Sequence, residues 1–74
     1  MPIQTVNVIE YADDAIQGIR SFEDTPDGNK EAENVFHDIV KENDPDATEA
    51  EINFFIEDGF HEQGDWQLFI THSN

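Results

Sequence analysis

Apolar residues in the middle of the chain recur with the period of an α-helix. Between positions 25 and 42 they stand at i, i+3, i+4, i+7 and i+8, which places them on one stripe of a helix. The stripe consists of Ala32, Val35, Phe36, Ile39 and Val40. Thr25 can cap the first turn by accepting a hydrogen bond from a free amide, and Pro26 suits the first helical position because it has no N–H to satisfy. The pattern predicts a helix over 26–42 on which the rest of the chain packs.

A second, shorter helix is predicted after a loop at 43–47. Pro45 disfavours helical geometry at the residue before it. Thr48 and Glu51 then have the spacing of a capping box, in which each side chain bonds to the other residue's backbone amide. The expected buried stripe is Ile52, Phe55 and Ile56. Gly59 fits the left-handed position that ends many helices.

Three segments have the composition of strands. Residues 5–11 and 15–22 are rich in β-branched and aromatic side chains, and only the short polar break 12–14 separates them, which favours a hairpin. Residues 65–72 form the third segment. The predicted fold is α+β over a single domain, 1–74: a three-stranded, mainly antiparallel sheet with two helices on one face, in the order β-β-α-α-β. The first two strands carry apolar residues on both sides, so a second copy of the chain can cover the open sheet face.

The charge of the chain narrows the class of partner. Eighteen Asp and Glu residues stand against three Lys and Arg, a net charge of −15. Direct binding to nucleic acid or to an anionic membrane needs a basic surface, so both are disfavoured and a large partner should be basic. The chain has no cysteine, which excludes disulfides and thiolate metal sites. It also has no apolar run long enough to cross a membrane and no signal-peptide pattern, so a cytoplasmic location is expected.

The acids concentrate around the second helix. Positions 42–65 hold nine acidic residues and no Lys or Arg. At 100° per residue, Phe54 turns away from the buried stripe and points outward among carboxylates. The candidate partner-binding residues are Glu49, Glu51, Phe54, Glu57 and Asp58. An alternative remains, in which Phe60 or the last strand folds over Phe54 and makes it part of the core.

The sequence predicts no catalytic residue, no cofactor and no metal site. Residues 44–48 resemble the start of a calcium loop, but Glu49 and Phe55 occupy the positions that need Gly and Glu. His37 is expected to be a solvated surface group. The remaining candidate for a weak metal or proton-transfer site combines a histidine and two acids. These residues are His61, Glu62 and Asp65.

These observations favour a small acidic protein-interaction module and not an enzyme. Such a module would mask a basic, nucleic-acid-binding surface of its partner, as DNA-mimicking inhibitors do. The alternative is an accessory domain without catalytic activity whose acidity serves solubility.

Overall fold

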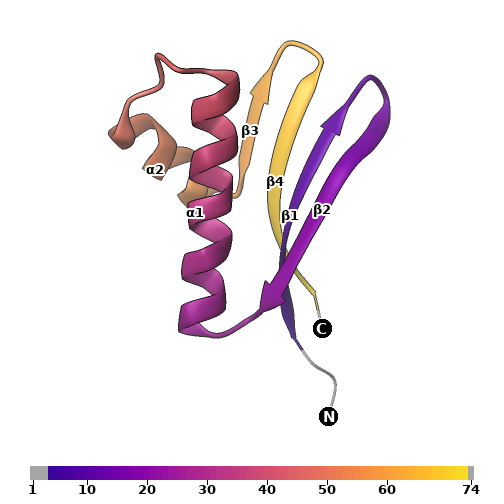
Figure 1. Ribbon diagram of the computed structural model, residues 1–74, viewed down its shortest axis with the longest axis vertical. Coiled ribbons are helices and arrows are strands. Elements are labelled where there is room, and N and C mark those ends of the chain that lie inside the picture. Colours follow the sequence, from indigo (N-terminus) through magenta and orange to yellow (C-terminus); the bar gives the residue numbers. More distant parts are fainter. Residues whose placement is uncertain (1–3, 74) are drawn as a thin grey trace.

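The computed structural model of the chain describes residues 4–73. Two helices and four strands follow one another in the order β-β-α-α-β-β (Figure 1). They are β1 (Thr5–Ala12), β2 (Ala15–Glu23), α1 (Pro26–Asn43), α2 (Glu49–Asp58), β3 (Phe60–Gln63) and β4 (Trp66–Ser73). The strands form one antiparallel sheet with the spatial order β2-β1-β4-β3. The predicted α+β class is confirmed, but the prediction of three strands is wrong.

Strand β3 is the element that the sequence did not predict. It has only four residues and one large apolar side chain, Phe60, so its own pattern is too short to identify a strand. It forms because Gly59 turns the chain directly from α2 onto the edge of β4, where the Ile70 amide donates to the Gly59 carbonyl at 2.8 Å. The strand therefore depends on a tertiary pairing.

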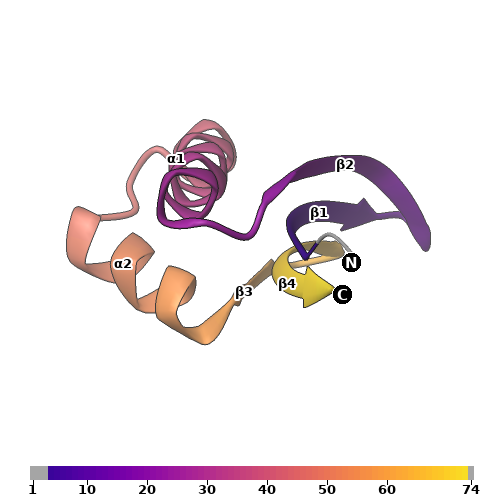
Figure 2. The same ribbon diagram turned by 90° about the horizontal axis from the view of Figure 1, so that it is seen from below.

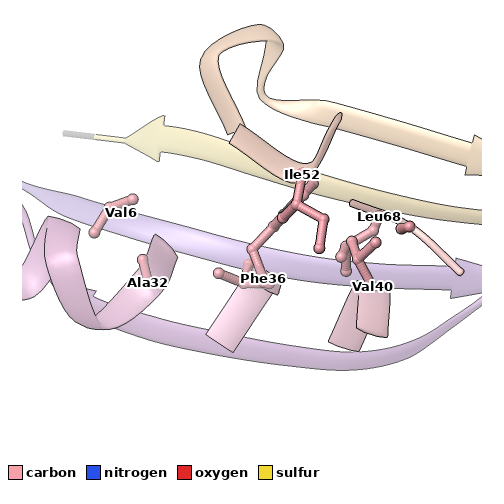
Figure 3. Close-up of a cluster of buried hydrophobic side chains, with 8 residues drawn as sticks. Val6, Ala32, Phe36, Val40, Ile52 and Leu68 are labelled. Carbon is pink, nitrogen blue, oxygen red and sulfur yellow. The ribbon is translucent and has the colours of Figure 1, made fainter. Parts of the chain in front are cut away.

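Both helices lie on the same side of the sheet and leave the other side open (Figure 2). Helix α1 packs along β1 and β2, and α2 packs against α1 and β3. Buried side chains from both helices, β1 and β4 meet in one core (Figure 3). The core consists of Val6, Val8, Ala32, Phe36, Val40, Ala47, Ile52 and Leu68. The predicted stripe of α1 is confirmed, with Val35 and Ile39 packed at the margin of this core.

The predicted caps of both helices are confirmed. Thr25 Oγ1 accepts from the Gly28 amide at 3.1 Å, and Thr48 and Glu51 form the full capping box. The Thr48 amide and hydroxyl donate to the Glu51 carboxylate, and these bonds lower the pKa of Glu51. Gly59 ends α2 with φ of 76°, in the left-handed region that glycine adopts without strain.

The loop into α1 is fastened to the last strand. The Asp24 carboxylate accepts from the Asn29 side chain at 2.7 Å and lies 3.0 Å from Nδ1 of His72. The hydrogen bond from Asn29, followed by that from His72, lowers the pKa of Asp24. These contacts join the start of α1 to β4, which β1 separates from β2 in the sheet.

The β1–β2 turn offers a direct test of backbone strain. Asp13 and Asp14 both have positive φ, 54° and 62°, as a two-residue type I′ turn requires. Asp tolerates this region less well than Gly, so we expect Asp14→Gly to raise the free energy of unfolding by about 1 kcal/mol. Chemical denaturation measures the change. Asp46→Gly, which removes the same side chain at a position without positive φ, is the control and should give no gain.

Candidate functional site

The exposed surface of α2 carries the most prominent apolar side chain outside the sheet. Phe54 is 62% exposed, so the alternative in which Phe60 or the last strand covers it is wrong. The predicted stripe accounts for this position, since Ile52 is fully buried and Phe55 and Ile56 pack against the core. An outward-facing aromatic ring has no structural role in the core and is available for contact with another molecule.

Three of the four predicted acids share the face of Phe54. At 100° per residue, Glu51, Glu57 and Asp58 lie within about 60° of Phe54 around the helix, whereas Glu49 lies about 140° away. Glu57 and Asp58 are exposed, and neither forms an ion pair within residues 4–73. Glu51 is exposed as well, although its carboxylate also closes the capping box.

Glu49 faces α1 instead of the outer surface. Its Oε2 lies 2.6 Å from Nε2 of His37, and Asp38 lies 3.5 Å from the other ring nitrogen. The prediction that His37 is a solvated surface group is therefore wrong, because this half-buried ring joins the two helices. The hydrogen bond to Glu49 raises the pKa of His37, with a smaller contribution from Asp38.

The His37 contact predicts a pH dependence of stability. Because the pKa of His37 is raised in the folded chain, its contribution is complete below the unfolded pKa and is lost as pH rises through the folded value. We expect His37→Gln to cost about 0.5 kcal/mol more near pH 6 than near pH 8.5, a size typical of a partly exposed pair. Chemical denaturation at both values measures the difference. If the free energies of unfolding of the wild-type chain and of His37→Gln change equally with pH, this role of His37 is contradicted. Glu49→Gln should show the same pH dependence as His37→Gln.

Phe54 borders a pocket between the end of α2 and β3. The pocket has a volume of about 380 Å³. We refer to its six lining residues as the α2 corner: Phe54, Phe55, Asp58, Phe60, His61 and Glu62. The Phe55 and His61 rings stack with centroids 4.1 Å apart, and the edge of Trp66 supports His61 from the side. The α2 corner is thus a set of braced aromatic walls with two carboxylates at its rim.

Half of the α2 corner lies on the strand that the sequence did not predict. Phe60, His61 and Glu62 belong to β3 and reach Phe54 only because Gly59 reverses the chain. One signal was present in the sequence. A short stretch that begins with Phe and is followed by Gly64-Asp65 and a β-rich segment has the form of a hairpin.

The structure does not bring His61, Glu62 and Asp65 together as a metal or proton-transfer site. Successive residues of β3 point to opposite faces, so His61 packs on Phe55 while Glu62 lies on the other side. Nε2 of His61 is buried and has no hydrogen-bond partner within the described part of the chain. No group of three or more potential metal ligands occurs among residues 4–73.

Two other acidic regions of the chain do not form a binding site like the α2 corner. In the loop that resembles a calcium site, the Lys41 ammonium donates to the Ala47 carbonyl at 2.7 Å and so supplies a cation from the chain itself. A wider hollow of about 460 Å³ lies between the two hairpin turns. Its acids are Asp13, Asp14, Glu62 and Asp65. Tyr11 is the one aromatic side chain that lines it, so it lacks the packed rings of the α2 corner.

Comparison with protein-family models, curated proteins and solved structures finds no match to this chain. Among residues 4–73, no helix combines the length and the apolar character that crossing a membrane requires. The case for a function therefore depends on the geometry and charge of the α2 corner.

Proposed function

We propose that the chain is a small acidic protein-interaction module whose α2 corner binds a basic surface of a partner protein. The observation that carries the proposal is the exposed Phe54 ring beside an aromatic pocket with a carboxylate rim. Burial of a Phe side chain is worth about 1.5–3 kcal/mol, whereas an exposed ion pair is worth about 0–1 kcal/mol. Phe54 would therefore supply most of the affinity, and the surrounding acids would steer and orient the partner.

The pocket itself suits the side chain of a lysine or arginine. The aliphatic stem of such a side chain would pack against Phe54 and Phe60, and its charge would lie near Asp58 and Glu62. The faces of aromatic rings attract cations as well, by about 0.5–1 kcal/mol at exposed sites. All Lys and Arg residues of the chain itself lie on α1 or β2, so the cation would come from the partner. They are Arg20, Lys30 and Lys41.

The spacing of the acids is compatible with mimicry of a nucleic-acid strand. Glu51 and Asp58 are separated by roughly 10 Å along the helix at 1.5 Å per residue, and Glu57 lies between them. A single DNA strand places about three phosphates over the same length. This similarity supports the more specific form of the proposal, in which the basic surface is one that binds nucleic acid.

Affinity capture from a lysate of the source cells tests the proposal. Tagged chain is compared with a variant carrying Glu57→Gln and Asp58→Asn, with and without nuclease, at about 0.05 M and 0.5 M NaCl. We expect a basic protein that survives nuclease, is released by salt and is lost from the variant. Glu31→Gln with Glu33→Gln, which removes two exposed charges from α1, is the matched control and should retain the partner.

Two results would contradict the proposal. One is capture that is equal for the α2 variant and the α1 control, because binding would then follow total charge. The other is recovery of no partner at low salt, which would favour an accessory domain whose acids serve solubility. The cytoplasmic location stays a prediction, and fractionation of the source cells tests it.

A further inference from the structure

The open face of the sheet carries a continuous apolar row across all four strands. In the register of the sheet, Ile19 of β2 lies opposite Ile9 of β1, and Ile9 lies opposite Phe69 of β4. Phe69 in turn lies opposite Phe60 of β3, with ring centroids 5.2 Å apart. Ile19 is 55% exposed, and Ile16, beside the row, is 57% exposed. We refer to Ile19, Ile9, Phe69 and Phe60 as the apolar row.

The centre of this face, around the row, is uncharged, which is unusual in a chain with a net charge of −15. By strand alternation, Glu23 and Glu62 are the strand acids on this face, at opposite ends. At the end of Glu62, the turn residues Asp13, Asp14 and Asp65 join it around the hollow that Tyr11 and Gln67 line. The neighbouring positions are neutral and polar or aromatic: Asn7, Tyr11, Ser21, Gln67 and Thr71. Ser21 donates to the Asn7 side chain at 2.7 Å, so these two polar groups satisfy each other within the face. The charges of this face thus lie at its two ends, and its centre is apolar or neutral.

We propose that a second copy of the chain covers this face, with the two sheets packed face to face. A basic partner has no electrostatic reason to choose the uncharged apolar row, whereas a second copy presents the same row. Consider a two-fold axis that lies between the two sheets, parallel to them, and passes over the centre of the row. Whether this axis runs along or across the strands, the apolar row of one copy meets that of the other. Charge and geometry therefore agree on a copy of this chain as the occupant.

The area of the face suits a weak pair. Strands of 8, 9, 4 and 8 residues, about 4.8 Å apart and with about 3.3 Å per residue, cover roughly 460 Å². Two copies would bury roughly 900 Å², slightly less than the size of about 1,000 Å² expected for a stable specific interface. An interface of this size is typical of weak complexes, so a dimer that dissociates on dilution is expected.

Salt separates this proposal from binding of a basic partner. Two chains of the same sign repel, and salt screens the repulsion, so self-association should strengthen as salt is added. Attraction between an acidic chain and a basic partner weakens under the same change. The two surfaces share Phe60, but Ile9 and Ile19 belong to the apolar row alone, so variants at these two positions test the dimer separately.

Sedimentation equilibrium of the full chain tests the proposal up to about 1 mM protein, at about 0.05 M and 0.5 M NaCl. We expect a monomer–dimer equilibrium that shifts toward dimer at the higher salt. Ile19→Asp should raise the dissociation constant at least tenfold, which is about 1.4 kcal/mol. Phe54→Asp adds the same charge to an equally exposed position on α2 and is the matched control, with a dissociation constant close to that of the wild-type chain.

Ile9→Thr distinguishes face-to-face packing from pairing between the free edges of two β2 strands. Ile9 lies in the central strand β1, and threonine preserves the β-branched side chain that strands favour. Weaker association of this variant, with an unchanged circular dichroism spectrum, supports the face-to-face dimer. A wild-type chain that stays monomeric at about 1 mM at both salt concentrations overturns the proposal. So does a dimer that neither Ile9→Thr nor Ile19→Asp weakens.

Discussion

Replacement of Gly28 by alanine is expected to lower the free energy of unfolding by about 3 kcal/mol. A Cβ atom at this position would lie 1.8 Å from the backbone carbonyl oxygen of Glu23, so α1 would have to move away from the end of β2. In an exposed helix the same change would be favourable by about 1 kcal/mol, because alanine is the better helix former. Here the steric contact outweighs propensity, since Gly28 is buried in the first turn of α1.

Thermal and chemical denaturation measure this effect. A loss of about 3 kcal/mol corresponds to a decrease in Tm of roughly 12–24 °C for a domain of this size. Gly18→Ala is the matched control, because a Cβ at Gly18 meets nothing within 4 Å. We expect that control to stay within about 0.5 kcal/mol of the wild-type chain. Equal stability of Gly28→Ala and the wild-type chain would show that α1 does not depend on this close approach.

Replacement of Phe54 by alanine is expected to weaken binding of the captured partner by roughly 30-fold, or about 2 kcal/mol. The ring is 62% exposed in the free chain, so its truncation removes surface that only the partner would bury. For the same reason the stability of the free chain should change by less than about 0.5 kcal/mol. Loss of affinity without loss of stability distinguishes a binding residue from a core residue.

Titration calorimetry with the purified partner measures this change, and Ile16→Ala is its control. Ile16 is 57% exposed, close to the exposure of Phe54, but it lies on β2 away from the α2 corner. The control variant should bind the partner as the wild-type chain does. Equal losses for both variants would mean that the partner does not select the α2 corner.

The sequence was sufficient for the elements that carry their own signals. Helix α1 has a cap, a long apolar period and a C-terminal loop, and the structure places it within one residue of the predicted end at 42. The capping box and Gly59 likewise located α2. These features are local, because each depends on residues within a few positions of one another.

The remaining features depend on contacts between distant residues. Strand β3 exists through its pairing with β4, and Gly28 is required because α1 docks on the Glu23 carbonyl. His37 and Glu49 are twelve positions apart, so helical spacing alone gave no reason to pair them. For the same reason the candidate site was predicted only in part. Phe54 and the acids on its face of α2 were predicted, whereas the β3 side chains that line the pocket were not.

Binding of a cation at the α2 corner can be followed directly by nuclear magnetic resonance. The probe is a capped glycine-arginine-glycine peptide, titrated into the isotope-labelled chain up to about 10 mM, since a single side chain binds weakly. We predict saturable shift changes concentrated at residues 54–62 and abolished by Phe54→Ala. Shift changes spread over all acidic surfaces, including Asp27 and Glu31 of α1, would contradict a specific cation site at the α2 corner and would identify the acidity as a general property of the chain.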